Sequence, residues 1–182
     1  MARFYTKKGD DGYTSLLGKG RARKYDHRIE TVGAIDEANA SIALARTLCL
    51  EAQSAAILLH VQKDMYHLMS EIVSTPENAV QFRKIDQASV SWLEDQISLL
   101  SEKVQIPDEF IIPGDSQAGA AIDLARTIVR RAERQTTRLV HAKKLENKFL
   151  LHYLNRLSSL CFLLELFENQ AAGREHSTLA KE

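Results

Sequence analysis

Four arginines lie within ten residues in A-R-T-I-V-R-R-A-E-R, residues 125–134. A helical repeat of about 100° per residue places Arg126, Arg130 and Glu133 on one face, with Arg134 at its edge. Guanidiniums that share a face repel each other unless carboxylates or a polyanion neutralise them, and their forked geometry matches carboxylate and phosphate oxygens. The spacing alone leaves two interpretations open: a polyanion site, or a solvated face with neighbouring carboxylates as partners.

A second segment with phosphate-binding chemistry is T-K-K-G-D-D-G-Y-T-S, residues 6–15. Its two glycines allow a tight turn with inward-pointing N–H groups, its lysines add positive charge, and its threonine and serine add hydroxyl donors. The segment has no Walker A spacing and no strand is expected before it. More basic residues follow at 19–28, a pattern that by itself is typical of a solvated surface.

A third feature is Asn155, in N-R-L-S-S within an otherwise Leu-rich segment. Asparagine is a poor helix former, and a carboxamide that faces a core needs hydrogen-bond partners. Asn155 therefore either bridges groups within the protein or contacts a ligand. The sequence shows no Ser/His/Asp arrangement and no paired carboxylates of the glycosidase type.

Composition limits the classes of function. The 182 residues carry 24 Lys+Arg and 24 Asp+Glu, a balance that argues against a general binder of nucleic acid or membrane surfaces. We expect a single domain spanning 1–182, with no signal peptide and no membrane span. Cys49 and Cys161 lack metal-type spacing, which predicts buried free thiols and a cytoplasmic protein.

Apolar residues at helical spacing predict an all-α fold, a five-helix up-and-down bundle, and it is joined by an N-terminal loop whose residues suit phosphate binding. Residues 1–26 are expected to form that loop, residues 102–114 a second loop, and residues 171–182 a flexible tail. The fourth helix is expected to begin at Asp115 or Ser116, because either is a good N-cap. The expected helices span 28–48, 52–74, 86–101, 115–140 and 146–169.

With these motifs in this order, the sequence resembles the PduO-type ATP:cob(I)alamin adenosyltransferases, also called corrinoid adenosyltransferases. The resemblance covers roughly residues 3–168. Besides the two basic segments and N-R-L-S, it rests on V-G-A-I-D-E-A-N at 32–39 and F-I-I-P-G at 110–114. Any one motif would be weak, whereas the ordered set is specific.

The resemblance implies transfer of the 5′-deoxyadenosyl group of ATP to cob(I)alamin, giving adenosylcobalamin and triphosphate. It implies Mg²⁺ carried by ATP, with no metal ligand from protein side chains. It also implies a homotrimer with active sites between subunits and an N-terminal loop that orders around ATP. A flavin-type reductase and an adenosylcobalamin-dependent enzyme are the implied protein partners.

Residue roles are carried over by position from the same resemblance. Phe110 is expected below the corrin ring, and Asp36 is expected to pair across the subunit interface with Arg126. Catalysis is assigned to Arg130, Asn155, Arg126 and Asp36. The ATP site is assigned to Thr6, Lys7, Lys8, Gly9, Asp10, Thr14, Ser15, Lys24, Arg130, Arg131, Glu133, Arg134 and Asn155.

Two positions depart from the family's usual pattern. Ser159 stands where an aspartate usually follows N-R-L-S, which keeps open a second interpretation: a non-catalytic carrier or chaperone that binds ATP and a corrinoid. Asp115 follows Gly114 where a second glycine is usual, and we expect this change to affect only a helix cap.

Overall fold

The computed structural model describes residues 5, 7–174 and 176–181, so Thr6 lies outside the described residues. Among these residues the chain forms six helices and one two-stranded sheet. The predicted, mostly helical fold is confirmed, although the count of five helices is short by one. The elements are β1 (Tyr13–Ser15), β2 (Arg21–Arg23), α1 (His27–Leu48), α2 (Ala52–Val73), α3 (Pro76–Phe82), α4 (Gln87–Ser101), α5 (Gln117–His141) and α6 (Phe149–Ala171).

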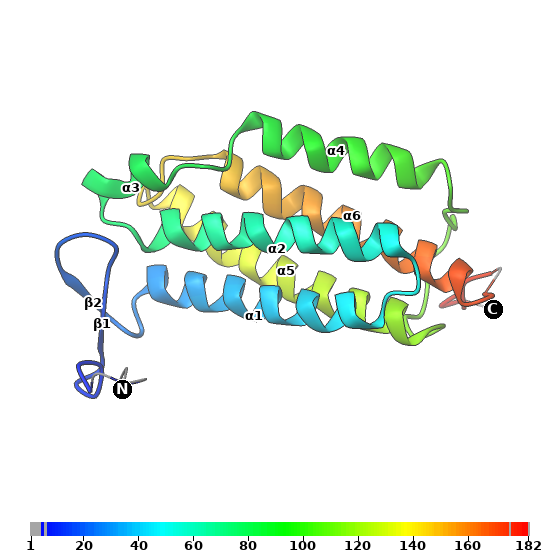
Figure 1. Cartoon of the computed structure of the whole chain (residues 1–182), viewed down its shortest axis with the longest axis horizontal. Coiled ribbons are helices and arrows are strands. Elements are labelled where there is room, and N and C mark those ends of the chain that lie inside the picture. The colour runs from blue at the N-terminus through cyan, green and yellow to red at the C-terminus, as the bar shows by residue number, and fades with distance from the viewer. Residues whose placement is uncertain (1–4, 6, 175, 182) are drawn as a thin grey trace.

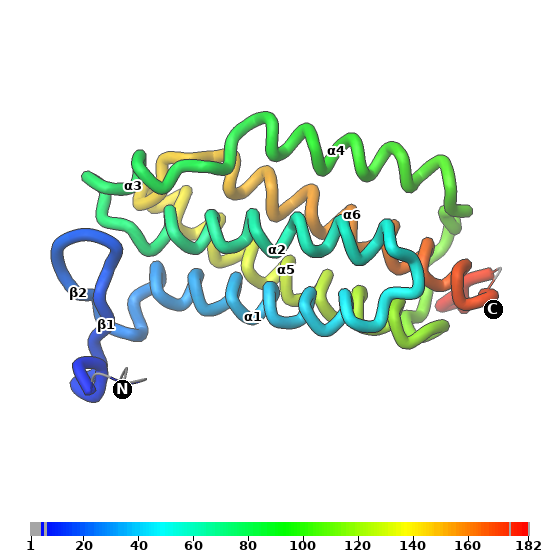
Figure 2. Tube along the Cα trace, in the orientation of Figure 1, coloured from blue at the N-terminus to red at the C-terminus, as the bar shows by residue number. Residues whose placement is uncertain are grey.

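The five long helices lie side by side and alternate in direction along the chain (Figures 1 and 2). Helix α5 packs against both α1 and α6, while α2 covers α1 and α4 covers α6. One continuous apolar core joins them, with fully buried side chains such as Ile35, Leu93 and Leu157 contributed by different helices. Burial of these apolar faces is the main force that fixes the helices relative to one another.

Side-chain caps define where three of the long helices begin. Asp26, Asp86 and Ser116 each accept a backbone N–H from the first turn of α1, α4 and α5, at 2.9, 3.1 and 2.9 Å. Each bond satisfies a donor that has no partner inside the helix. The expected cap at Ser116 is confirmed, whereas Asp115 has a different role, described below.

The extra helix α3 lies between the expected helices 52–74 and 86–101, where the sequence analysis placed no helix. Pro76 begins a short helix. Proline is favourable at the first helical position because its φ is already helical and because a backbone N–H there would have no acceptor within the helix. The N-terminal loop also contains an antiparallel pairing of β1 with β2, centred on Thr14 and Ala22. Strands of three residues carry too little alternation to be recognised from the sequence.

Residues 176–181 belong to the segment expected to form a flexible tail, and they make hydrogen bonds with the 110–115 loop. Cys161 is buried as expected, whereas Cys49 is only partly buried. Among the described residues, no helix is long and apolar enough to cross a membrane.

Candidate functional site

Helix α5 carries the central residues of the predicted anion site. Arg130 and Arg134 are one turn apart on the same face, and both are exposed. Neither guanidinium has an ion-pair or hydrogen-bond partner among the described residues. Two neighbouring cations without carboxylate partners leave a local positive field that suits a polyanionic ligand.

Asn155 on α6 faces this part of α5. Its Nδ2 donates to Glu133 Oε1 at 2.9 Å, so α6 and the arginine face of α5 are joined by a direct bond. Its Oδ1 accepts from Arg156 Nη1 at 2.8 Å, and Arg156 Nε in turn donates to Glu94 Oε1 on α4 at 2.9 Å. This chain of bonds fixes the Asn155 carboxamide on the exposed surface of the bundle, so Asn155 does bridge groups within the protein.

The other two arginines of the motif have local partners. Arg131 forms an ion pair with Glu37 on α1, so it points away from Arg130. Arg126 Nε lies 2.6 Å from Asp123 Oδ1 on the same helix. Within one chain, Arg126 and Arg131 therefore have carboxylate partners, whereas Arg130 and Arg134 have none among the described residues.

The predicted pairing of Asp36 with Arg126 is a contact between subunits, which a single chain cannot display. Asp36 is exposed on α1, and no hydrogen bond or ion pair involves its carboxylate among the described residues. The pairing stays a prediction, with Asp123 as a competing partner for Arg126 within the chain.

The N-terminal loop holds its predicted ATP-binding residues in two tight turns. Asp10 N donates to Lys7 O at 3.3 Å and Gly12 N donates to Gly9 O at 3.2 Å, with Lys7 at φ +60° and Gly12 at φ +81°. Positive φ is costly for a lysine, so the first turn holds some strain. The exposed side chains of Lys7 and Lys8 place positive charge at this turn, which suits an anionic ligand.

Two long-range contacts close this loop. A Cβ added at Gly9 would lie 3.2 Å from Lys24 Nζ, so the glycine allows the lysine side chain to cross the loop closely. Arg21 Nη1 and Nη2 each lie 2.8 Å from a carboxylate oxygen of Asp11, in a forked pair. Thr14 is half buried in β1 and Ser15 follows it at the exposed end of that strand.

The loop projects beyond one end of the helical bundle (Figure 1). Leu17 joins it to the end of α2, through bonds with Val73 O at 3.2 Å and Thr75 N at 3.1 Å. Arg28 belongs to the basic residues at 19–28, a pattern typical of a solvated surface, but its side chain instead holds the start of α1 in place. Its guanidinium donates to Ile72 O, Ser74 O and Lys144 O at 2.7, 2.8 and 2.9 Å.

The connection between α4 and α5 lies at the opposite end of the bundle (Figure 1), and Phe110 within it is 88% exposed. Phe110 lines a pocket of about 350 Å³ together with Phe162, Arg126 and Asp123. An exposed aromatic ring over a pocket with a partly apolar wall provides a flat contact surface for a large planar ligand. The structure thus brings Phe110 and Arg126 into one pocket, a proximity that the sequence did not reveal.

Glu165 is the functional candidate in this pocket that sequence reasoning missed. Its side chain is fully buried, and neither carboxylate oxygen has a hydrogen bond of normal geometry. Burial, followed by repulsion from Asp123, raises the pKa of Glu165 to about 7, against a smaller lowering by Arg126. In the sequence Glu165 appears only as a polar interruption of a Leu-rich stretch, so no local signal marks it.

Metal binding by the protein alone has no support in the described part of the chain. There, no group of three or more His, Cys, Asp or Glu side chains could hold a metal ion.

Comparisons with known proteins agree with these features. The sequence profile of a family described as cobalamin adenosyltransferase matches residues 4–168. A corrinoid adenosyltransferase from Bacillus subtilis is 35% identical over 176 residues, covering 94% of this chain and 89% of that protein. A cobalamin adenosyltransferase from Cupriavidus metallidurans is 35% identical over 174 residues, covering 95% and 91%. The solved structure of a variant PduO-type ATP:corrinoid adenosyltransferase from Lactobacillus reuteri, complexed with cobalamin and ATP, has a TM-score of 0.88 at 29% identity, covering 99% of this chain and all of that one.

Proposed function

This chain belongs to the cobalamin adenosyltransferase family, and we propose that it transfers the 5′-deoxyadenosyl group of ATP to cob(I)alamin. The products are adenosylcobalamin and triphosphate. One observation carries the proposal: Arg130 and Arg134 stand unpaired beside the Glu133–Asn155 bond, on an exposed face that joins α5 to α6. Such a face can bind the triphosphate of ATP.

The reaction forms one bond and breaks one. The electron pair of cobalt(I) attacks the 5′ carbon of the ribose, the new cobalt–carbon bond forms, and the bond from that carbon to the triphosphate oxygen breaks. Triphosphate leaves with the bonding pair, so negative charge grows on the oxygen that leaves. Arg130 and Arg134 stabilise that charge, and no protein nucleophile is needed.

The N-terminal loop supplies the remaining nucleotide contacts in this proposal. Lys7, Lys8 and Lys24 provide cations, and Gly9 and Asp10 form the turn that holds Lys7 and Lys8 at the site. Thr14, Ser15 and, outside the described residues, Thr6 complete the assignment. Mg²⁺ bound to the phosphates would reduce repulsion between them and further neutralise the leaving group.

We also propose a homotrimer in which neighbouring chains share each site. The loop projects past the end of the bundle, and neither of its strands packs against α5 as the long helices do. A second copy offers a way to bring such a loop onto the arginine face. Asp36 of one chain and Arg126 of its neighbour are the proposed contact between them.

Phe110 is assigned to the lower face of the corrin. An aromatic ring there has no lone pair to offer cobalt, so it favours loss of the lower axial ligand. A cobalt centre without axial ligands accepts an electron more readily, which assists formation of the nucleophilic cobalt(I) state. Positioning of the two substrates then supplies the remaining acceleration.

The test is an anaerobic assay with purified protein, Mg·ATP and chemically reduced cobalamin. We expect the absorbance of cob(I)alamin to be replaced by that of adenosylcobalamin. A protein that leaves cob(I)alamin unchanged while binding both ligands contradicts catalysis.

Binding of both ligands without conversion of cob(I)alamin is the result expected for the second candidate function, a carrier that binds ATP and a corrinoid without turnover. Ser159 favours it, since this exposed serine lies one helical turn after Asn155 where the family usually has an acid. A Ser159→Asp variant assayed in parallel separates the two functions. Activity gained only with the aspartate identifies the natural chain as the carrier.

A further inference from the structure

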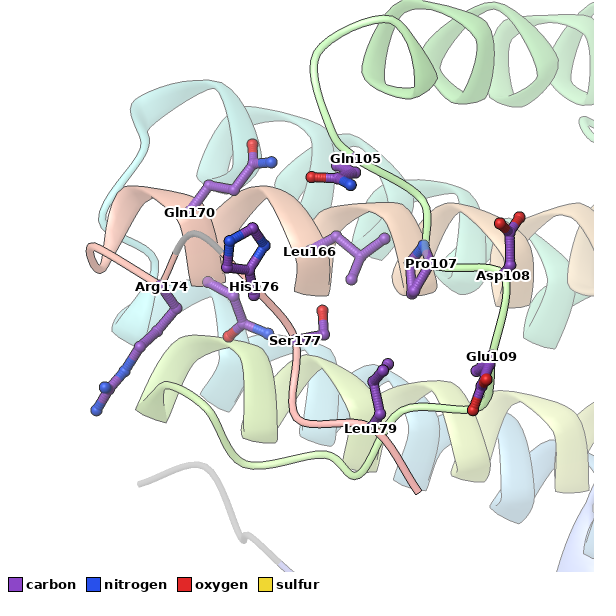
Figure 3. A pocket seen from close by; sticks show the side chains of 11 residues that line it. Gln105, Pro107, Asp108, Glu109, Leu166, Gln170, Arg174, His176, Ser177 and Leu179 are labelled. Carbon is purple, nitrogen blue, oxygen red and sulfur yellow. The ribbon is translucent and has the colours of Figure 1, made fainter. Parts of the chain in front are cut away.

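The segment after α6 folds back along the loop that carries Phe110 (Figures 1 and 3). Gly173 makes the reversal possible: it has φ +78°, where a side chain would be strained, and its N–H donates to Gln170 O at 2.9 Å. The chain then returns toward the start of α5, and Leu179 reaches the 110–112 segment. Residues at the end of the chain therefore lie beside a residue of the proposed corrin site.

Two backbone hydrogen bonds join this tail, residues 176–181, to the Phe110 loop. Ala180 N donates to Phe110 O and Ile112 N donates to Thr178 O, both at 2.8 Å. Among the described residues, these are the only backbone hydrogen bonds made by residues 108–112. Since the Phe110 ring is almost fully exposed, side-chain packing within the chain does not hold it, and the tail is the main restraint on its backbone.

The tail is itself held by Asp115. Asp115 Oδ1 accepts from Thr178 Oγ1 at 2.6 Å and Oδ2 accepts from Thr178 N at 3.0 Å, so one carboxylate takes both donors of one residue. Arg174 Nε also donates to Asp115 O at 3.1 Å. Bonds to an ionised acceptor are shorter and stronger than neutral ones.

Packing beneath the tail is incomplete, which makes these bonds more important. A cavity of about 350 Å³ lies between the tail, the 105–109 segment and α6, with Leu166, Ser177 and Leu179 on its walls (Figure 3). A tail that spans a cavity gains little from apolar burial there. Its position depends mainly on the polar contacts to the loop.

We propose that Asp115 and Thr178 are positioning residues that hold Phe110 in place beneath the corrin. The proposal rests on the adenosyltransferase function argued above and goes beyond it. Phe110 excludes the lower axial ligand only if its ring stays at one place, and a loop free to move would let that ligand or water return to cobalt. The Asp115–Thr178 contact keeps the tail paired with the Phe110 backbone and so restricts that motion.

The experiment compares Asp115→Ala and Thr178→Val with the unmodified chain. The valine keeps the shape and the backbone N–H of Thr178 and removes only the hydroxyl. We expect kcat to fall about tenfold in Asp115→Ala, and less in Thr178→Val, since small misplacements near a reacting centre have effects of this order. The KM for ATP should not change, because the arginine face lies elsewhere on α5.

The second readout is the electron paramagnetic resonance spectrum of cob(II)alamin bound in the presence of Mg·ATP. It reports whether cobalt has a lower axial ligand and requires no turnover. We expect the four-coordinate fraction to fall in both variants, and to be partly kept in Asp115→Asn, which retains one acceptor. Glu102→Ala, which removes an exposed acid from the same connection between α4 and α5, is the control and should behave like the unmodified chain.

Two results overturn the proposal: an unchanged four-coordinate fraction in both variants, or a fall in kcat that comes with an equal rise in the KM for ATP. If Asp115→Ala fails to fold, Thr178→Val alone decides. Absence of turnover in the unmodified chain counts against the proposed function instead, and the spectrum then still tests the positioning role.

Discussion

Arg130 and Arg134 keep exposed, unpaired guanidiniums, whereas Arg126 and Arg131 on the same helix are ion paired. This difference assigns the charge that stabilises the leaving group to the unpaired residues. Arg130→Ala should lower kcat by roughly 100-fold or more, the usual effect of removing one donor from a developing negative charge. The measurement is the initial rate of the anaerobic assay at saturating substrates.

The control for Arg130→Ala is Arg138→Ala, which removes the same charge two turns further along α5, where the side chain is exposed. It should leave the rate and the assembly unchanged. A rate near that of the unmodified chain in Arg130→Ala would remove this residue from the mechanism.

Glu165 gives a residue-scale prediction about pH. Its pKa is raised to about 7 in the folded chain by burial and by Asp123, from about 4.5 in an unfolded chain. The folded state therefore binds the proton more tightly, so this carboxyl stabilises the fold most below pH 4.5, and that contribution is lost as the pH rises through 7. By pH 8 the loss amounts to roughly 3 kcal/mol, since one pKa unit corresponds to about 1.4 kcal/mol.

Glu165→Gln should accordingly unfold at a higher temperature than the unmodified chain at pH 8, and the difference should shrink toward pH 5. Thermal unfolding followed by circular dichroism across this range measures the effect. Glu102→Gln, at an exposed acid, is the control measured in parallel. A difference between Glu165→Gln and the unmodified chain that stays constant from pH 5 to pH 8 would mean that folding does not raise the pKa of Glu165.

At the scale of elements, Arg28 links the start of α1 to the last carbonyls of α2 and to the end of α5. A cation is favourable there because helix C-termini carry partial negative charge. Arg28→Ala should lower the free energy of unfolding by about 2–3 kcal/mol, as expected for losing hydrogen bonds to a charged group. Urea denaturation measures it, with Arg23→Ala in the exposed strand β2 as the control. Equal midpoints for the two variants would show that the link contributes no stability.

The long helices could be predicted from sequence because their apolar periodicity and their caps are local signals. Asp86 and Ser116 mark helix starts within a residue or two of where they occur. Helix α3 was missed because a helix of seven residues that begins with a proline shows too little periodicity. The contacts of the tail could not be predicted because its partner Asp115 lies 63 residues earlier in the chain, a contact that no local pattern reveals.

The candidate site was likewise only partly predictable from sequence. The resemblance, which rests on the order of the motifs, pointed to Arg130, Asn155 and Phe110. Only the folded structure shows that Asn155 is hydrogen-bonded to Glu133 and that Arg126 lines a pocket with Phe110. Burial of Glu165 depends on how α5 and α6 pack, so its raised pKa follows only from the folded chain.

At the scale of the whole molecule, the proposed assembly is a trimer in which neighbouring chains share each site. Asp36→Ala and Arg126→Ala should each weaken subunit association. The double variant should associate about as strongly as the weaker of the two single variants, because both changes remove the same contact. Sedimentation velocity over a range of concentrations measures the association. Additive losses would show that Arg126 is engaged only by Asp123 within its own chain.

The proposed function of this chain is to form the bond between cobalt and the 5′ carbon of ATP. The most direct measurement is a single turnover under anaerobic conditions, with Mg·ATP, excess protein and cob(I)alamin, followed by chromatography of both products. The account predicts one adenosylcobalamin and one triphosphate for each cob(I)alamin consumed. Cob(I)alamin that stays bound and unreacted, or ATP broken down to products other than triphosphate, would contradict it.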